Sequence, residues 1–318
     1  MHITSQYWLT RHSILTCCEI LKCRELCDTN LYNKMPSEDY ALYVKEMRDW
    51  LNSQAHLPKD VSDNILYRFA HSCYFNMEKA KKAAELFFTI RGNSPEILAD
   101  RDPFSPHMAK FIKTVNLACI TISGNRRVWI WQLNDPGLEN YDYLTDAKLF
   151  FLTTDSWLLD EETQFYENDI VVMDVKDIGI KMLTKLNMSI AKKLSKYQQE
   201  AMPIRLKHIH FVNSSSIMDK LFTVFKSLLN KEIIDLIHFH QPNSDSLFKF
   251  FNKDELPEDY GGTLPAMKVL MADAMKRLEK NRELLNNENL WVAQTKKNKK
   301  SAPAPVVEID SFRSLAID

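Results

Sequence analysis

Glycine is scarce in this chain, with six glycines among 318 residues. Enzymes that cradle phosphates on glycine-rich loops need several glycines at fixed spacing, and the stretch Gly124-Asn125-Arg126-Arg127 lacks both those glycines and the lysine. A G-x-S-x-G nucleophile elbow is also missing. These absences argue against a phosphate-loop enzyme and against a hydrolase built on such an elbow.

The chain also lacks a charge excess and a long apolar run. Its 41 Lys and Arg face 42 Asp and Glu, and this near-zero balance argues against bulk nucleic-acid binding. No run reaches the roughly 18 apolar residues that a membrane span requires. The apolar stretch Tyr7–Leu21 is interrupted by Arg11, His12 and Glu19, and no small-x-small cleavage site follows it. We therefore expect a cytosolic protein.

Cysteine is sparse but uneven. Four of the six cysteines crowd near the N-terminus at positions 17, 18, 23 and 27, whereas Cys73 and Cys119 stand alone. The crowded group has no paired C-x-x-C spacing and no second ligand pair, so free thiols on a helix are favoured and a metal site is the alternative.

Apolar and aromatic residues are plentiful, with 45% hydrophobic residues and 17 phenylalanines. The first recognisable pattern is a series of short amphipathic segments, from Ser37 to Leu51, Asp60 to His71, and Asn76 to Gly92. They predict a small helical domain. Our expected divisions are an N-terminal extension (1–35), a helical domain (36–106), an α/β domain (107–285) and a C-terminal tail (286–318).

Beyond residue 106, β-type runs alternate with helical patterns. The expected strands are 128–133, 170–174, 208–212 and 237–240, and the expected helices are 107–113, 145–160, 182–199, 217–229 and 265–285. Gly124-Asn125 is a turn signal before the first of these strands. Such alternation indicates an α/β fold with a mixed, largely parallel sheet.

The stretch Tyr197–His240 is central to this pattern. Between its two strands lies a helix with a broad apolar face made of Ile217, Leu221, Phe222, Val224, Phe225, Leu228 and Leu229. The serines at 214–216 that open the helix fit a cap, with a catalytic nucleophile as the alternative. Four histidines flank it at positions 208, 210, 238 and 240, and each pair shares one strand face. They predict a half-buried sheet face, with a metal site as the alternative.

Several segments together resemble the CRAL-TRIO lipid-binding family, close to its α-tocopherol-transfer-protein-like and retinaldehyde-binding branch. Leu66–Phe69 and Phe75–Ala80 resemble its N-terminal helical domain. Met202–His210 resembles the segment before its third strand, with Met202 in an aromatic position. Leu256–Gly262 resembles its L-P-x-E-Y-G-G signature, with aspartate at residue 259. The resemblance extends from about Glu38 to Gly262.

This resemblance implies a non-enzymatic carrier without a cofactor. A sheet would form the floor of an apolar pocket, and the mobile helix Ile217–Leu229 would form its lid. The ligand would be a hydrophobic small molecule such as a retinoid, a tocopherol-like or another isoprenoid lipid, taken from a membrane surface. Two alternatives remain open: a phosphoinositide-responsive membrane adaptor with the same fold, and an α/β enzyme that uses Ser214 to Ser216.

Residues are assigned to sites through the resemblance. The implied ligand-binding residues are Phe151, Asp155, Ile180, Leu186, Leu194, Tyr197, Met202, Ile204, Leu206, Ile209, Leu221, Val224, Phe225 and Leu228. The implied phosphoinositide-binding residues are Arg205, Lys207, Lys226 and Lys231.

Two departures from the family pattern bear on the ligand. Phe151 and Asp155 replace small hydroxyl residues of tocopherol-binding members, and a buried Asp155 needs a donor to offset its charge. Glu232 and Leu236 stand at basic positions of the head-group cleft, and His71-Ser72-Cys73 replaces a basic turn. We therefore expect a ligand other than tocopherol and weakened phosphoinositide binding. The basic run 296–300 fits a solvated tail, with acidic-lipid binding or a nuclear signal as alternatives.

Overall fold

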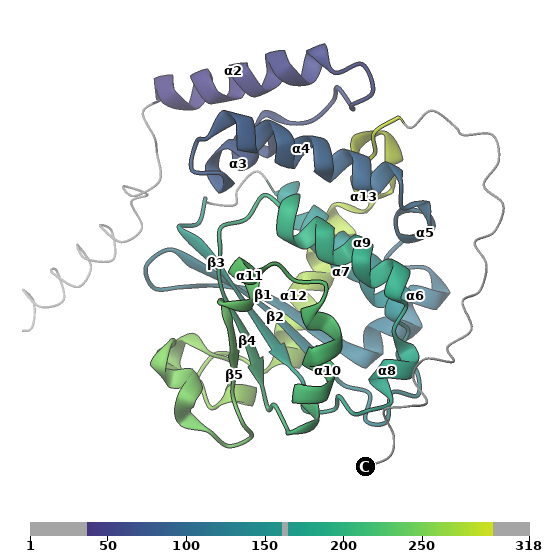
Figure 1. The fold of residues 1–318 in the computed structure, drawn as a ribbon, viewed down its shortest axis with the longest axis vertical. Helices are drawn as coiled ribbons and strands as arrows, with labels where there is room; N and C mark the ends of the chain where they lie inside the picture. The colour runs from purple at the N-terminus through teal and green to yellow at the C-terminus, as the bar shows by residue number, and fades with distance from the viewer. Residues whose placement is uncertain (1–36, 161–164, 295–318) are drawn as a thin grey trace, which may run out of the picture.

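The chain builds a group of helices first and a helix-covered sheet second, as the computed structural model shows (Figure 1). The structure describes residues 37–160 and 165–294. The four crowded cysteines, the N-terminal extension and the basic run of the tail lie outside these described residues.

The helical region comprises α2 (Ser37–Ser53), α3 (Asp63–Ser72), α4 (Met77–Gly92) and the short α5 (Pro95–Leu98). Side-chain caps define two starts: Ser62 accepts a bond from the Ile65 amide at 3.3 Å, and Asn76 accepts one from the Lys79 amide at 3.1 Å. The helices pack through fully buried apolar side chains, namely Met47, Leu51, Leu66, Phe69, Ala84 and Phe87. The three helices predicted from periodicity are confirmed.

A five-stranded mixed sheet follows α6 (Pro106–Phe111) and the 3₁₀ turn η1 (Ile112–Thr114), and its strand order follows the sequence. The strands are β1 (Val115–Ile122), β2 (Arg126–Leu133), β3 (Asn168–Asp174), β4 (Leu206–Val212) and β5 (Ile237–Phe239). β1 pairs antiparallel with β2, and every later pairing is parallel. Gly124 and Asn125 adopt φ of 71° and 52°, which allows the tight β1–β2 turn.

Helices cover the sheet mainly on one face. They are α7 (Tyr143–Leu158), α8 (Met182–Lys185), α9 (Met188–Glu200), α10 (Ile217–Lys226) and α11 (Lys231–Ile234). They are followed by α12 (Met267–Lys280), α13 (Arg282–Asn286) and the 3₁₀ turn η5 (Glu288–Leu290). The opposite face packs against the 3₁₀ segments η2 (Asp245–Lys249), η3 (Lys253–Glu255) and η4 (Glu258–Tyr260).

The predicted elements differ from the structure at several places. β1 was not among the predicted strands, and the helix expected over 265–285 is two helices, α12 and α13, which meet at Asn281. The helix expected over 182–199 is two helices, because Asn187 accepts bonds from the amides of Ser189 and Ile190 and so caps a new start. The helix expected over 217–229 ends at Lys226.

The segment Leu256–Gly262 fixes the start of α12. A Cβ atom on Gly262 would lie 1.8 Å from the Leu256 carbonyl oxygen, so only glycine fits there. Asp259 accepts a bond from the Met267 amide at 2.7 Å, at the first turn of α12. The aspartate at this position of the signature therefore satisfies the first amide of a helix that packs against β1 and α7. Among the described residues, no helix has both the length and the apolar character needed to cross a bilayer.

Candidate functional site

A cavity of about 450 Å³ lies between one face of the sheet and helices α7, α9, α10 and α12. This volume falls in the range of small-molecule pockets. Strand residues on alternating positions form its floor, because successive side chains of a strand point to opposite faces. The floor includes Trp129, Trp131, Val171, Met173, Ile209 and Phe211. The walls are mainly aliphatic and aromatic.

Most residues that the resemblance implied as ligand contacts line this cavity. They are Leu186, Leu194, Met202, Ile204, Leu206, Ile209, Leu221, Phe225 and Leu228. They come from the loop before α9, α9 itself, the approach to β4, β4, and α10 with the turn after it. The structure thus gathers them on one volume. Their contact with a ligand stays a prediction.

The other implied contacts lie elsewhere. Ile180 precedes α8 and is 55% exposed. Val224 is half-buried on α10 but is not part of the cavity wall. Phe151 and Tyr197 stack on each other in the core, with ring centroids 4.5 Å apart, and burial raises the pKa of the Tyr197 phenol. Asp155 is fully buried beside them and also lies outside the wall.

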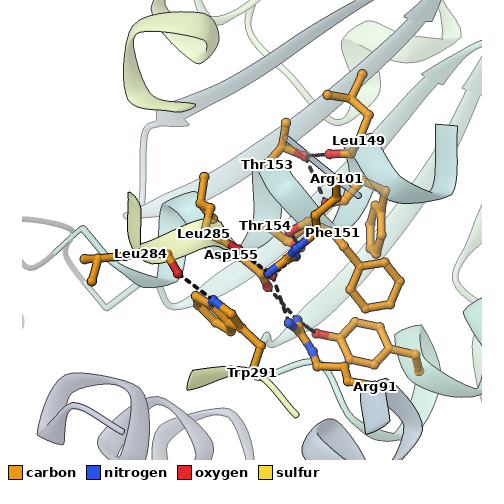
Figure 2. Close-up of polar contacts among 12 residues, drawn as sticks. Arg91, Arg101, Leu149, Phe151, Thr153, Thr154, Asp155, Leu284, Leu285 and Trp291 are labelled. Carbon is orange, nitrogen blue, oxygen red and sulfur yellow. Dashed lines mark hydrogen bonds and ion pairs between the residues drawn. The ribbon is translucent and has the colours of Figure 1, made fainter. Parts of the chain in front are cut away.

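Asp155 lies outside the cavity wall, and two arginines bind its carboxylate (Figure 2). Arg91 of α4 makes a two-pronged contact, with bonds of 2.8 and 2.5 Å to the two carboxylate oxygens. Arg101 donates to the same carboxylate at 2.5 Å and to the Leu285 carbonyl at 2.9 Å. Arg91 also donates to the Tyr197 hydroxyl at 2.5 Å. The carboxylate is therefore neutralised by protein groups, and a ligand donor is not needed there.

The cavity wall also includes residues that the family resemblance did not imply as ligand contacts. They include Cys119, Trp129, Trp131, Asp146, Phe150, Trp157 and Phe222. The strand alternation of Trp129 and Trp131 was a usable signal for one shared face. Cys119 keeps accessible surface, as a wall residue of an open cavity does, and desolvation by the apolar groups around it raises the pKa of its thiol to about 11.

Asp146 is a charged group in an otherwise apolar part of the wall. It lies in the first turn of α7, and its two oxygens accept bonds from the Trp131 indole N–H at 3.2 Å and the Tyr141 hydroxyl at 2.7 Å. Burial raises the pKa of this carboxyl to about 6, against the lowering effect of the Tyr141 and Trp131 bonds, and nearby Asp142 raises it further.

α10 covers the cavity with one side only. Its side chain Leu221 is 1% exposed and points into the cavity, whereas Thr223 on the outer side is exposed. The far end of the helix is tied to α9: Ser195 and Gln199 donate to the Leu228 carbonyl at 2.8 and 3.0 Å. A few hydrogen bonds thus hold the end of the covering segment.

The implied phosphoinositide residues divide into two kinds. Arg205 is engaged by the protein: it donates to the His71 carbonyl at 2.8 Å, lies 3.6 Å from Glu167 and covers the Tyr74 ring. The three lysines at positions 207, 226 and 231 are exposed, and the described residues offer them no ion-pair partner. Anionic head-group binding at these lysines stays a prediction.

The four histidines lie on the sheet face opposite the cavity and form two pairs across β4 and β5. The ring nitrogens of His208 and His238 are 3.1 Å apart, and those of His210 and His240 are 2.9 Å apart. Within residues 37–160 and 165–294, no group of three or more His, Cys, Asp or Glu is placed to hold a metal ion. The rings thus pair with each other, His240 also contacts the Ser246 hydroxyl at 2.7 Å, and the Nε2 atom of His210 has no hydrogen-bond partner among the described residues. The metal alternative for the histidines stays untested.

Fold and cavity together define a two-region protein in which a helix-covered sheet encloses an apolar site. Residues 123–262 match the CRAL/TRIO domain family, and residues 36–108 match the Pinta-like UBA domain. Residues 123–262 thus form a CRAL/TRIO domain, which confirms the resemblance drawn from the motifs.

The comparisons also found individual proteins that are similar to this chain. Alpha-tocopherol transfer protein-like of Homo sapiens is 26% identical over 229 residues, which are 69% of this chain and 64% of that protein. Clavesin-1 of Xenopus laevis is 30% identical over 118 residues, 37% of this chain and 35% of that protein. The crystal structure of Sfh5 covers 74% of this chain and 91% of its own, with 12% identity and a TM-score of 0.44. The chain thus matches less than two thirds of the length of the first of these relatives.

Proposed function

We propose that this protein is a non-enzymatic carrier that binds a hydrophobic small molecule of the retinoid, tocopherol-like or other isoprenoid class in the cavity under α10. The observation that carries the proposal is the cavity itself, about 450 Å³ with mainly apolar walls. Moving an apolar chain from water into such walls is favourable by about 0.8 kcal/mol per CH₂ group, so a closed apolar site can compete with a bilayer for a lipid.

In this proposal α10 is the lid. Its apolar side lines the cavity when closed, and the same side meets the membrane when the helix swings out. Three features support this role: the one-sided burial of the helix, the small number of bonds at its end, and the exposed lysines 226 and 231 beside it. Exposed lysines attract anionic lipid surfaces.

The test compares two charge insertions on the lid. Leu221→Asp places a carboxylate on the cavity side, and we expect at least a tenfold loss of retinol or tocopherol uptake from phosphatidylcholine vesicles, because the cavity offers no partner for that charge. Thr223→Asp places the same charge on the exposed side and serves as the matched control, with uptake near that of the parent. Uptake is measured by extracting the protein fraction and quantifying the lipid by mass spectrometry.

Unchanged uptake by a folded Leu221→Asp protein would show that the lid face is assigned wrongly. A protein that yields no apolar ligand on extraction, yet binds phosphoinositide vesicles tightly, would replace the carrier by the membrane adaptor. Replacing Lys226 and Lys231 by glutamine separates these outcomes, because an adaptor would lose vesicle binding while a carrier would mainly load more slowly.

A further inference from the structure

The charged side chains of the cavity wall differ in how they are neutralised. Asp273 and Arg277 on α12 pair with Lys276 at 3.0 Å and with Asp160 at 2.5 Å. Asp146 has no cation partner among the described residues and is held by the neutral donors Trp131 and Tyr141. A carboxylate in an apolar wall without a countercharge is costly, so its remaining acceptor sites favour any donor that enters the cavity.

Asp146 keeps acceptor capacity that faces the cavity. A carboxylate offers about four lone-pair sites, and the two described bonds occupy one site on each oxygen. The side chain is only partly buried although it lies under the helical layer, and it belongs to the cavity wall. Its open surface is therefore the surface presented to a ligand.

Several other polar groups of the wall bond within the protein. Thr153 and Thr154 donate to carbonyls of their own helix, with bonds of 3.0 Å to Leu149 and 2.9 Å to Phe150. Ser195 and Gln199 donate to the carbonyl at the end of the lid segment. Tyr143 and Gln198 also line the wall, but neither carries a charge, so the Asp146 carboxylate is the strongest acceptor available to the polar end of a ligand.

We infer that Asp146 selects ligands whose polar end donates a hydrogen bond, and that the cargo of this cavity is an isoprenoid alcohol rather than the aldehyde or acid of the same skeleton. A hydroxyl donates to the carboxylate and is charge-neutral. An aldehyde oxygen can only accept hydrogen bonds, so it finds no donor at the Asp146 carboxylate. An ionised carboxylic acid would place a second negative charge beside Asp146, which is unfavourable. The inference rests on the proposed carrier function and narrows its ligand class.

The experiment uses three retinoids of nearly equal shape as probes: retinol, retinal and retinoic acid. Binding to the full chain is followed by quenching of tryptophan fluorescence, since Trp129, Trp131 and Trp157 line the cavity. We expect retinol to bind at least tenfold more tightly than either of the others. In Asp146→Asn this preference should fall to about threefold or less, because the amide lacks the charge and adds a donor. Asp49→Asn, an exposed carboxylate on α2, is the matched control and should keep the full preference.

The outcomes separate the inference from the carrier function. Equal binding of retinol and retinal by the parent protein would overturn the inference and leave the carrier intact, and this arm needs no variant. A folded Asp146→Asn protein that keeps the tenfold preference would overturn it as well, as would a co-purified lipid without a hydroxyl donor. A protein that binds none of the three retinoids and yields no apolar lipid on extraction would overturn the carrier function itself.

Discussion

At the scale of single residues, Asp155 stands where tocopherol-binding members are expected to have a small hydroxyl residue. Its charge nevertheless does not lie in the cavity. The carboxylate is not part of the cavity wall and is fully buried between Arg91 and Arg101 (Figure 2). A buried ion network of this kind adds little net stability, but removing one member leaves the others uncompensated. Asp155 therefore acts on folding, whereas Asp146 lies on the cavity wall.

Replacing Asp155 by alanine should destabilise the protein strongly. Two buried guanidinium groups would lose their counter-charge, so we expect the free energy of unfolding in urea to fall by about 3–5 kcal/mol. Asp102→Ala is the control, since Asp102 pairs with Arg282 at the surface at 2.5 Å and should cost about 1 kcal/mol or less. Equal losses in the two variants would contradict the importance of the buried network.

The sequence supports only part of this residue-scale picture. It places Asp155 on a helix and shows that a buried carboxylate there needs a partner. It does not identify the partners, because Arg91 and Arg101 lie 64 and 54 residues away and no local pattern singles them out from 41 basic residues. Asp146 was missed for a similar reason: whether a first-turn aspartate faces solvent or a cavity depends on Trp131 and Tyr141 packing against it.

At the scale of elements, periodicity predicts the long amphipathic helices and the central strands but not every boundary. The helical pattern over 182–199 runs on through Leu186, although the backbone there is extended at ψ 135° and a new helix starts. β1 lacks a regular inward–outward alternation of burial because α12 covers part of this edge strand, so its pattern is weak. For β4 and β5, the sequence pattern predicted that the two histidines of each strand share a face. It did not predict that the two strands pair.

The histidine pairs on β4 and β5 should make the protein sensitive to acid. Burial, and then the neighbouring rings of residues 240, 238 and 208, lower the pKa of His210 to about 3. The unfolded chain therefore binds the proton more readily, and stability is full above pH 6.5 and falls as the pH drops toward 3, by about 1.4 kcal/mol per pH unit for each such histidine. His71, whose pKa burial also lowers to about 3, adds to the same window.

Urea unfolding at pH 7.5, 6.0 and 5.0 measures this dependence. His210→Gln removes one titrating ring and should flatten the fall in stability below pH 6.5. His56→Gln is the control, because His56 is part-exposed and its ring contacts Glu85 rather than another histidine. A fall that is equally steep in His210→Gln would show that the acid sensitivity arises elsewhere.

At the scale of the whole molecule, the segment after α13 joins the helical region to the sheet region. Trp291 is 1% exposed, its indole N–H donates to the Leu284 carbonyl at 2.9 Å, and the Arg91 guanidinium lies over its ring (Figure 2). Beyond it, the Ala293 amide bonds to the Phe88 carbonyl of α4 at 3.0 Å. The family match is split between residues 36–108 and 123–262, and the Asp155 network crosses that division, while the segment after α13 lies outside both ranges and contacts α4.

The two regions should therefore unfold as one cooperative unit, and Trp291 should contribute to the stability of both. Trp291→Ala leaves a cavity where α4 meets the C-terminal segment, and we expect a loss of about 3–5 kcal/mol. Leu284→Ala, at a side chain that is 45% exposed, is the control and should change stability by about 0.5 kcal/mol or less.

Hydrogen exchange followed peptide by peptide reports both regions at once. In the parent, the slowest amides of α3 and β3 should open with the same free energy, because both need global unfolding. In Trp291→Ala, opening free energies of α3 and β3 that fall together would indicate one cooperative unit. A fall confined to α3 would mean that the helical region unfolds independently of the sheet region.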